Sequence, residues 1–169
     1  CGLFEGNLYI ITGYLDAVTN PAYVDWYYNI RDFVKDRTQV HNYIENNALQ
    51  DPFYEQVFIP LFSQAAKTKG VIIPISPDGR KKPDKFSRIE GNLEPLNRAG
   101  RIIFNDREKD NPNMVRLEEQ FKLVAPGLPA PGDGPDAIEG AFFIIQQKTA
   151  AQMAGATVYG KRELNSKRI

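Results

Sequence analysis

The sequence predicts an α/β fold with a largely parallel sheet. Short runs rich in β-branched and aromatic residues alternate with longer segments whose apolar residues recur every three or four positions. Strands that alternate with helices in this way are typical of α/β proteins. At 169 residues the chain has the length of one domain with a sizeable core.

The predicted strands are short, and three of the four main ones follow a glycine or an asparagine. They are Leu8–Leu15, with Leu3 and Phe4 as the end of an earlier strand, then Val40–Ile44, Val71–Ile75 and Arg101–Asn105. The third run, VIIPI, is apolar throughout, which predicts a strand that is parallel to its neighbours and buried on both faces.

The predicted helices have an apolar face and recognisable ends. They are Ala22–Val34, Pro52–Lys69, Lys85–Asn97, Met114–Val124 and a final helix that begins near Asp133. Pro60 should kink the second helix, and Gly70 and Gly100 should end the second and third. We expect the basic tail, Gly155–Ile169, to be loosely ordered.

The composition excludes several kinds of site. Twenty-one basic and 21 acidic residues cancel, so a DNA-binding surface must come from local segregation of charge. With only Cys1 and His41, the chain lacks a disulfide framework, a cysteine zinc site and a histidine relay. Metal ligands would be carboxylates, which favour Mg²⁺ or Mn²⁺ over Zn²⁺. No apolar run reaches the length of a membrane span and no signal peptide is visible, so we expect a cytoplasmic setting.

The stretch Pro131–Gly140, PGDGPDAIEG, holds the main candidate residues. Asp133 and Asp136 stand three apart where a Pro/Gly-rich loop becomes a helix, so their carboxylates should share a face. Two carboxylates suit a divalent cation such as Mg²⁺. They also suit an N-cap with an acidic partner at N3, favoured by the helix dipole, and the residues alone leave both interpretations open.

Glu45 is the third candidate acid. It stands at the carboxyl end of the strand Val40–Ile44, where sites form in open α/β sheets, although a solvated acid at a strand end explains it as well. If Glu45 met Asp133 and Asp136, the cluster would need cations to neutralise it. Two metal ions held by carboxylates are a standard arrangement for phosphodiester hydrolysis.

The densest basic cluster in the interior of the chain is a candidate DNA-binding surface. It consists of Lys81, Lys82, Lys85 and Arg88. These side chains could hold the DNA backbone without regard to sequence, or form a solvated loop and helix face. Lys85 is the strongest candidate, because a cation at a helix start is otherwise disfavoured by the dipole.

Five stretches, taken in order, resemble the C-terminal nuclease domain of the large terminase subunit of tailed bacteriophages, the motor that packages and cuts phage DNA. They are YIENNA (Tyr43–Ala48), KKPDKFSRIE (Lys81–Glu90), GRIIFND (Gly100–Asp106), NPNMVRLEEQF (Asn111–Phe121) and GDGPDAIEGA (Gly132–Ala141). The last is the most specific, and together they cover most of the chain. The resemblance implies an RNase H-like fold over residues 1–154, with a mixed central sheet flanked by helices, followed by a basic tail over residues 155–169.

The resemblance also implies a two-metal-ion endonuclease that cuts concatemeric double-stranded DNA with Mg²⁺ or Mn²⁺. Glu45 matches the acid at the end of the family's central strand, and Asp133 and Asp136 match its last acidic motif, so all three would be catalytic metal ligands. Gly132 stands where the family has the earlier aspartate of that motif. The first-strand aspartate has no match, so we expect the first strand to be absent from this chain and the fragment to be inactive by itself.

The implied partners are double-stranded DNA, the terminase ATPase domain, the small terminase subunit and the portal, in the cytoplasm of a bacterial host and with no membrane. The phosphate-binding pattern of the ATPase motor does not occur in the sequence. Two other functions remain open. One is a non-catalytic docking module that contacts portal and motor, and the other is a related RNase H-like recombination nuclease or transposase.

Overall fold

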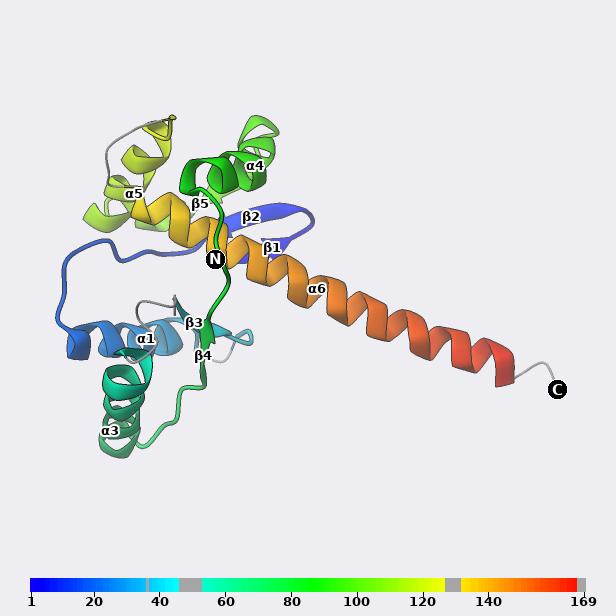
Figure 1. The fold of residues 1–169 in the computed structure, drawn as a ribbon, viewed down its shortest axis with the longest axis horizontal. Coiled ribbons are helices and arrows are strands. Elements are labelled where there is room, and N and C mark those ends of the chain that lie inside the picture. The colour runs from blue at the N-terminus through cyan, green and yellow to red at the C-terminus, as the bar shows by residue number, and fades with distance from the viewer. Residues whose placement is uncertain (36, 46–52, 127–131, 167–169) are drawn as a thin grey trace. The chain divides into compact units, whose positions relative to one another are not determined.

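The computed structural model describes residues 1–35, 37–45, 53–126 and 132–166 (Figure 1). The chain divides into two compact units. The first unit comprises residues 1–16 and 83–169, and the second unit comprises residues 17–82. The fold is mixed α/β, as predicted, but its described strands form two separate sheets, one in each unit, instead of one central sheet.

The sheet of the first unit has the strand order β1-β2-β5. Strands β1 (Gly2–Phe4) and β2 (Asn7–Ile10) form an antiparallel hairpin, and β5 (Ile102–Phe104) lies parallel to β2. The hairpin turn, Glu5 and Gly6, has positive φ at both residues, which matches the right-handed twist of the two strands. The strand predicted before this turn is confirmed, whereas the predicted Leu8–Leu15 strand is shortened to β2.

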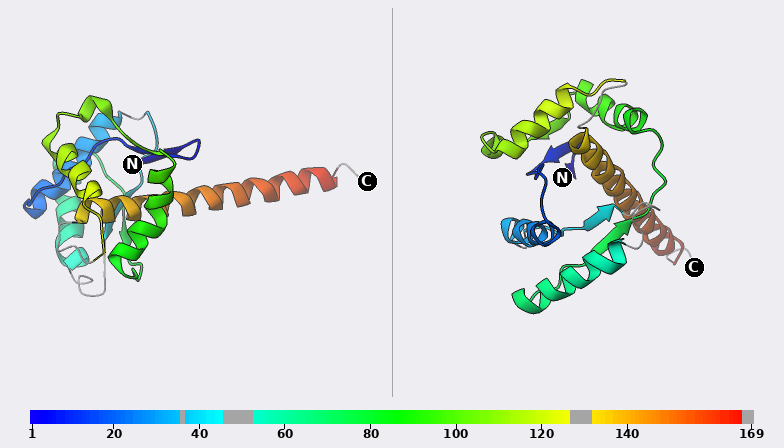
Figure 2. Two further views of the ribbon diagram at one scale, coloured as in Figure 1. Left: turned by 90° about the horizontal axis from the view of Figure 1, so that it is seen from above. Right: turned by 60° about the vertical axis from the view of Figure 1, so that its left-hand side comes forward.

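Helices α4 (Lys85–Arg98), α5 (Pro112–Lys122) and α6 (Asp133–Ser166) pack around this sheet, with the 3-10 turn η2 (Asp106–Glu108) between β5 and α5. The starts of α4 and α5 are determined by the local sequence. The side chains of Asp84 and Asn111 are the N-caps and accept hydrogen bonds from backbone N–H groups of these helices. The first half of α6 packs against both α4 and α5, and its second half extends beyond them (Figures 1 and 2). The core consists of Leu8, Ile10, Ile89, Leu93, Met114, Leu117, Ile138 and Phe142.

The second unit contains α1 (Asn20–Val34), β3 (Asn42–Glu45), the π-helical turn η1 (Tyr54–Phe58), α3 (Ile59–Lys69) and β4 (Ile75–Asp78). Strands β3 and β4 are parallel and pair Asn42 with Ile75 and Glu45 with Asp78. The core consists of Val24, Tyr28, Ile44, Phe58, Phe62 and Ile73.

Three predictions about these elements need correction or refinement. The strand predicted at Val71–Ile75 is wrong, because β4 begins only at Ile75 and Ile72 is 82% exposed. Pro74 has no N–H to donate to a strand ladder, which accounts for the later start. The interruption predicted at Pro60 takes the form of η1, which precedes α3. The backbone of residues 155–166 is helical, as part of α6.

Gly70 and Gly100 both have positive φ at the ends of α3 and α4, which confirms them as helix terminators. Within the described ranges, no helix combines the length and apolar character needed to cross a bilayer.

Candidate functional site

Charged and polar side chains of α4 and α6 face one another along the contact between these helices. We call this set the α4–α6 ladder. Its members are Lys85, Arg88 and Asn92 on α4 and Asp133, Asp136 and Glu139 on α6. The acids recur every three residues, so they share a face of α6, and the α4 residues recur at three and four.

The outer end of the ladder is open to solvent. Lys85 Nζ lies 2.9 Å from Asp133 Oδ1 and 3.9 Å from Asp136 Oδ2. The side chain of Asp133 is 75% exposed and that of Asp136 is 18% exposed. One ammonium group therefore bridges the two predicted metal ligands.

The inner end of the ladder is buried. The guanidinium of Arg88 donates to Asp136 Oδ1, to Glu139 Oε2 and to the carbonyl oxygen of Pro83. Glu139 is 1% exposed and also accepts a hydrogen bond of 2.8 Å from Asn92 Nδ2. Buried charges need such partners, because an unpaired one is strongly destabilising. The buried guanidinium of Arg88 therefore holds one carboxylate oxygen of Asp136 in place.

The start of α6 is closed by α5. The N–H of Gly134 donates to Gln120 Oε1 at 2.9 Å, and the N–H of Asp136 donates to the carbonyl of Gly132. Gly132 therefore holds the N-cap position, and Asp133 is the first helical residue. Gly134 allows close packing, because a Cβ there would lie 2.4 Å from Leu117 Cδ1. Both acids lie in the first turn, where the helix dipole favours them.

Glu45 lies in the second unit and has a separate basic partner. It is the last residue of β3, its side chain is 48% exposed, and its Oε1 lies 3.0 Å from Lys82 Nζ. On β4, burial raises the pKa of Asp78, but the hydrogen bonds and charge of Arg80, with Lys82, outweigh it and lower the pKa overall. The rest of the YIENNA motif, residues 46–48, lies outside the described residues.

The structure groups the predicted site residues into two sets. Asp133 and Asp136 meet Lys85 and Arg88 in the first unit. Glu45 meets Lys82 in the second unit. Lys81 is exposed, whereas Arg88 is 8% exposed and directed at carboxylates, so its position is interior and not DNA-facing.

Sequence reasoning missed Glu139, Asn92 and Gln120. Glu139 follows Asp136 by three residues, so extending the helical spacing by one step would have found it. Asn92 and Gln120 gave no such signal, because their partners lie on another helix.

The donor chemistry at the start of α6 fits one metal ion. Mg²⁺ is commonly held by one or two carboxylates with water and substrate phosphate, and Asp133 and Asp136 supply that number. The ammonium of Lys85 between them shows that a cation is accommodated at this point. Among the residues that the structure describes, no three histidine, cysteine or acidic side chains form a group suited to a metal. A second ion would require a further ligand, for which Glu45 is the sequence-based candidate.

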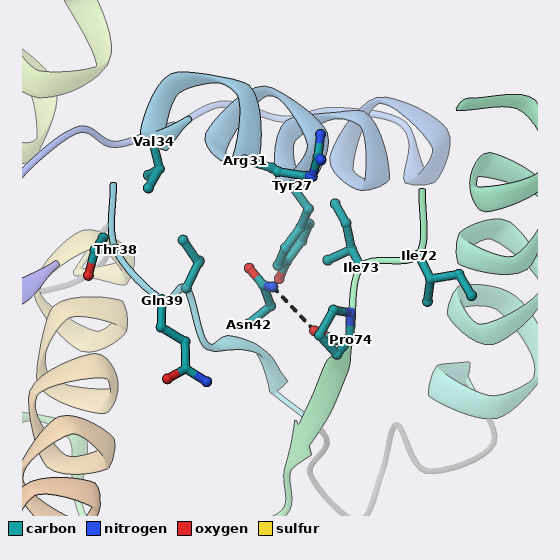
Figure 3. Close-up of a pocket in the computed structure, with 10 residues that line it drawn as sticks. Tyr27, Arg31, Val34, Thr38, Gln39, Asn42, Ile72, Ile73 and Pro74 are labelled. Atoms are coloured by element: carbon teal, nitrogen blue, oxygen red, sulfur yellow. Dashed lines mark hydrogen bonds between the residues drawn. The ribbon is translucent and has the colours of Figure 1, made fainter. Parts of the chain in front are cut away.

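A pocket in the second unit is a different kind of feature. It has a volume of about 210 Å³ and lies between α1 and the segment before β4 (Figure 3). Tyr27, Val34 and Ile73 contribute apolar surface, and the side chain of Asn42 donates to the carbonyl of Pro74. The described residues that line it include no acid. It is smaller than typical ligand pockets of roughly 300–1,000 Å³.

Comparisons of the chain with protein-family models, curated proteins and solved structures give no match. The resemblance to terminase nuclease domains therefore stays a prediction based on the motifs themselves.

Proposed function

We propose that this chain is the metal-dependent endonuclease domain of a phage terminase large subunit, with an RNase H-like fold, acting on double-stranded DNA. The supporting observation is the pairing of Asp133 and Asp136 around one cation at the start of α6. Both belong to GDGPDAIEGA, the most specific of the five motifs. The ATPase domain, the small subunit and the portal are its proposed partners.

In this proposal Asp133 and Asp136 would hold Mg²⁺ or Mn²⁺, which would supply an activated water and charge stabilisation at the phosphate. Asp133 is the exposed ligand, and Asp136 is the ligand held in place by Arg88. The resemblance implies that Glu45, at the carboxyl end of β3, would be a third carboxylate ligand.

In this proposal the basic residues that are exposed to solvent bind DNA. Lys81 is exposed, and Lys82 and Lys85 are partly exposed. These lysines would hold the phosphate backbone by a contact that carries no sequence information. Arg88 takes no part in that contact, because it is buried in the α4–α6 ladder. Its role in the proposal is to hold Asp136.

A non-catalytic docking module is the second candidate. The observation that favours it is that each predicted ligand already has a basic partner, Lys82 for Glu45 and Lys85 or Arg88 for the two aspartates. If these pairs are only structural, the acids contribute to stability and bind no metal.

DNA cleavage by the full-length protein separates the two candidates. Nicking of supercoiled plasmid is measured in Mg²⁺, in Mn²⁺ and in excess chelator, for wild type, Glu45→Ala and Asp133→Ala. We expect each substitution to lower the cleavage rate by about two orders of magnitude or more, because the metal supplies several kcal/mol of stabilisation.

The matched control is Asp25→Ala. Asp25 is an exposed acid that lies 2.9 Å from Lys69 Nζ, as Asp133 does from Lys85. It should leave the rate unchanged. Unchanged cutting in Glu45→Ala and Asp133→Ala would refute the nuclease proposal.

A further inference from the structure

We propose that Lys85 is an internal competitor of the divalent cation. Its ammonium group lies between Asp133 and Asp136, and metal binding at these carboxylates would require it to leave. This inference rests on the proposed function, since it concerns how the same two carboxylates take up their ion.

The ammonium group of Lys85 contacts two carboxylates, as a metal ion held by both aspartates would. Its Nζ lies within 4 Å of one oxygen from each aspartate, at 2.9 Å and 3.9 Å. The end of its stem passes over Gly132, where an added Cβ would lie 3.6 Å from Lys85 Cε. The head group is thereby held over the first turn of α6, where a metal ion bound by both aspartates would lie.

The charges of the ladder balance when Lys85 is exchanged for a divalent ion. Asp133, Asp136 and Glu139 carry three formal negative charges, and Lys85 and Arg88 carry two positive charges, which leaves −1. When a divalent ion replaces Lys85, its charge of +2 and the charge of +1 on Arg88 together balance the three carboxylates. If both cations stayed, the ladder would carry +1, and two positive charges would share one exposed carboxylate.

Lys85 can leave, whereas Arg88 cannot. Arg88 is 8% exposed and donates to Asp136, Glu139 and the Pro83 carbonyl. The side chain of Lys85 is 40% exposed and has one close acceptor, Asp133. Lys85 is also the first residue of α4, where the helix dipole disfavours a cation. Removal of Lys85 from the aspartates therefore breaks one short contact, to the exposed Asp133, and one longer contact, to Asp136.

The alternative is that Lys85 is an ordinary surface ion pair that ties α4 to α6. Such pairs contribute at most about 1 kcal/mol, and losing one would change stability slightly. It would not make metal binding tighter. The direction in which removal of the Lys85 charge changes the metal affinity therefore distinguishes competition from an ion pair that only stabilises the contact between α4 and α6.

The test is Mn²⁺ affinity, measured at low ionic strength by titration calorimetry and by the electron paramagnetic resonance signal of free Mn²⁺. Lys85→Met keeps the length of the stem and removes the charge. We expect it to bind Mn²⁺ about fivefold more tightly than wild type, the factor that corresponds to one exposed ion pair. Lys69→Met, which removes the partner of Asp25, is the control and should not change the affinity. Lys85→Gln serves as a second variant if Lys85→Met does not fold.

The outcomes separate this inference from the proposed function. If wild type binds Mn²⁺, Asp133→Asn abolishes binding, and Lys85→Met binds equally or more weakly, then competition is refuted and the metal site stands. If neither wild type nor Lys85→Met binds Mn²⁺, the metal site itself is refuted, and the competition with it.

Discussion

Lys85 and Asp133, the first residues of α4 and α6, form a salt bridge in which Nζ and Oδ1 are 2.9 Å apart. The two residues are 48 positions apart in the sequence and belong to the two motifs KKPDKFSRIE and GDGPDAIEGA. The contact places a predicted DNA-binding lysine on a predicted metal ligand.

Gly132→Asp should strengthen cation binding at the start of α6. Among the residues that the structure describes, a Cβ at this position meets Lys85, at 3.6 Å from Cε and 3.8 Å from Nζ, which is ordinary contact. The new carboxylate would lie beside Asp133 and add negative charge where the ion binds. We expect Mn²⁺ affinity to rise several-fold by titration calorimetry. Gly132→Asn has nearly the same shape without the charge, and equal affinities for the two variants would contradict the prediction.

Gly134→Ala should destabilise the first unit. Its new Cβ would lie 2.4 Å from Leu117 Cδ1 and 2.9 Å from Gln120 Oε1, so these two side chains must move or α5 and α6 must separate. Overpacking of this kind costs about 1–3 kcal/mol of unfolding free energy. The control is Gly91→Ala in α4, where a Cβ meets none of the described atoms within 4 Å. That change should stabilise by about 0.5–1 kcal/mol. Urea denaturation measures both, and a similar effect of the two substitutions would show that the α5–α6 contact is looser than described.

Glu139→Gln should destabilise the protein although it changes few atoms. The buried guanidinium of Arg88 would keep Asp136 but lose its second carboxylate, and the Asn92 contact would remain. Weakening a buried, charge-assisted hydrogen bond costs about 1–3 kcal/mol. Glu94→Gln is the matched change at an exposed ion pair on α4, with Arg98, and should cost less than about 1 kcal/mol. Equal losses in thermal unfolding would rule out a special role for the buried pair.

Asp84 should make part of the stability of α4 dependent on pH. Hydrogen bonds from the backbone N–H and hydroxyl of Ser87 hold the pKa of the Asp84 carboxyl below its ordinary value of 3.8. A lowered pKa in the folded state stabilises the protein above the unfolded-state value, and this stabilisation is lost as the pH falls through the folded-state value. Wild type should therefore lose melting temperature below about pH 4.

Asp84→Asn keeps a good N-cap without a titrating group, so the Asp84 contribution to the acid-induced loss should disappear in this variant. Asp84→Ala should lower the melting temperature at neutral pH as well. Identical pH profiles of wild type and Asp84→Asn between pH 2 and 6 would contradict the assignment, and calorimetry at several pH values measures them.

The helices could be predicted from the sequence because their signals are local. Asp84 and Asn111 cap α4 and α5, and Gly70 and Gly100 end α3 and α4. The strands could not be predicted as well, because pairing depends on residues far apart in the chain. β2 pairs with β5 across more than ninety positions, and neither strand carries a signal that excludes β3 and β4 from the same sheet. The division into two units was missed for the same reason.

Only part of the candidate site was predictable: its acids Asp133 and Asp136 were, but Glu139, Asn92 and the contacts between the side chains were not. The spacing of Asp133 and Asp136 on one helix indicated a shared face, and the structure places both beside Lys85. The partner of each acid is set by the packing of α4 on α6, which no short motif encodes. Arg88 shows the difference most clearly, since it belongs to a basic cluster in the sequence and is buried between two carboxylates in the fold.

The most direct test of the nuclease proposal is a crystal structure of the protein with Mn²⁺, with the ion located by anomalous diffraction. The proposal predicts an anomalous peak bound by Asp133 and Asp136, with Lys85 Nζ displaced from Asp133. It also predicts that Glu45 binds the same ion or a second one about 3.5–4 Å away. The contradictory result is a structure without a peak at these aspartates, in which Lys85 stays on Asp133 and Glu45 stays on Lys82.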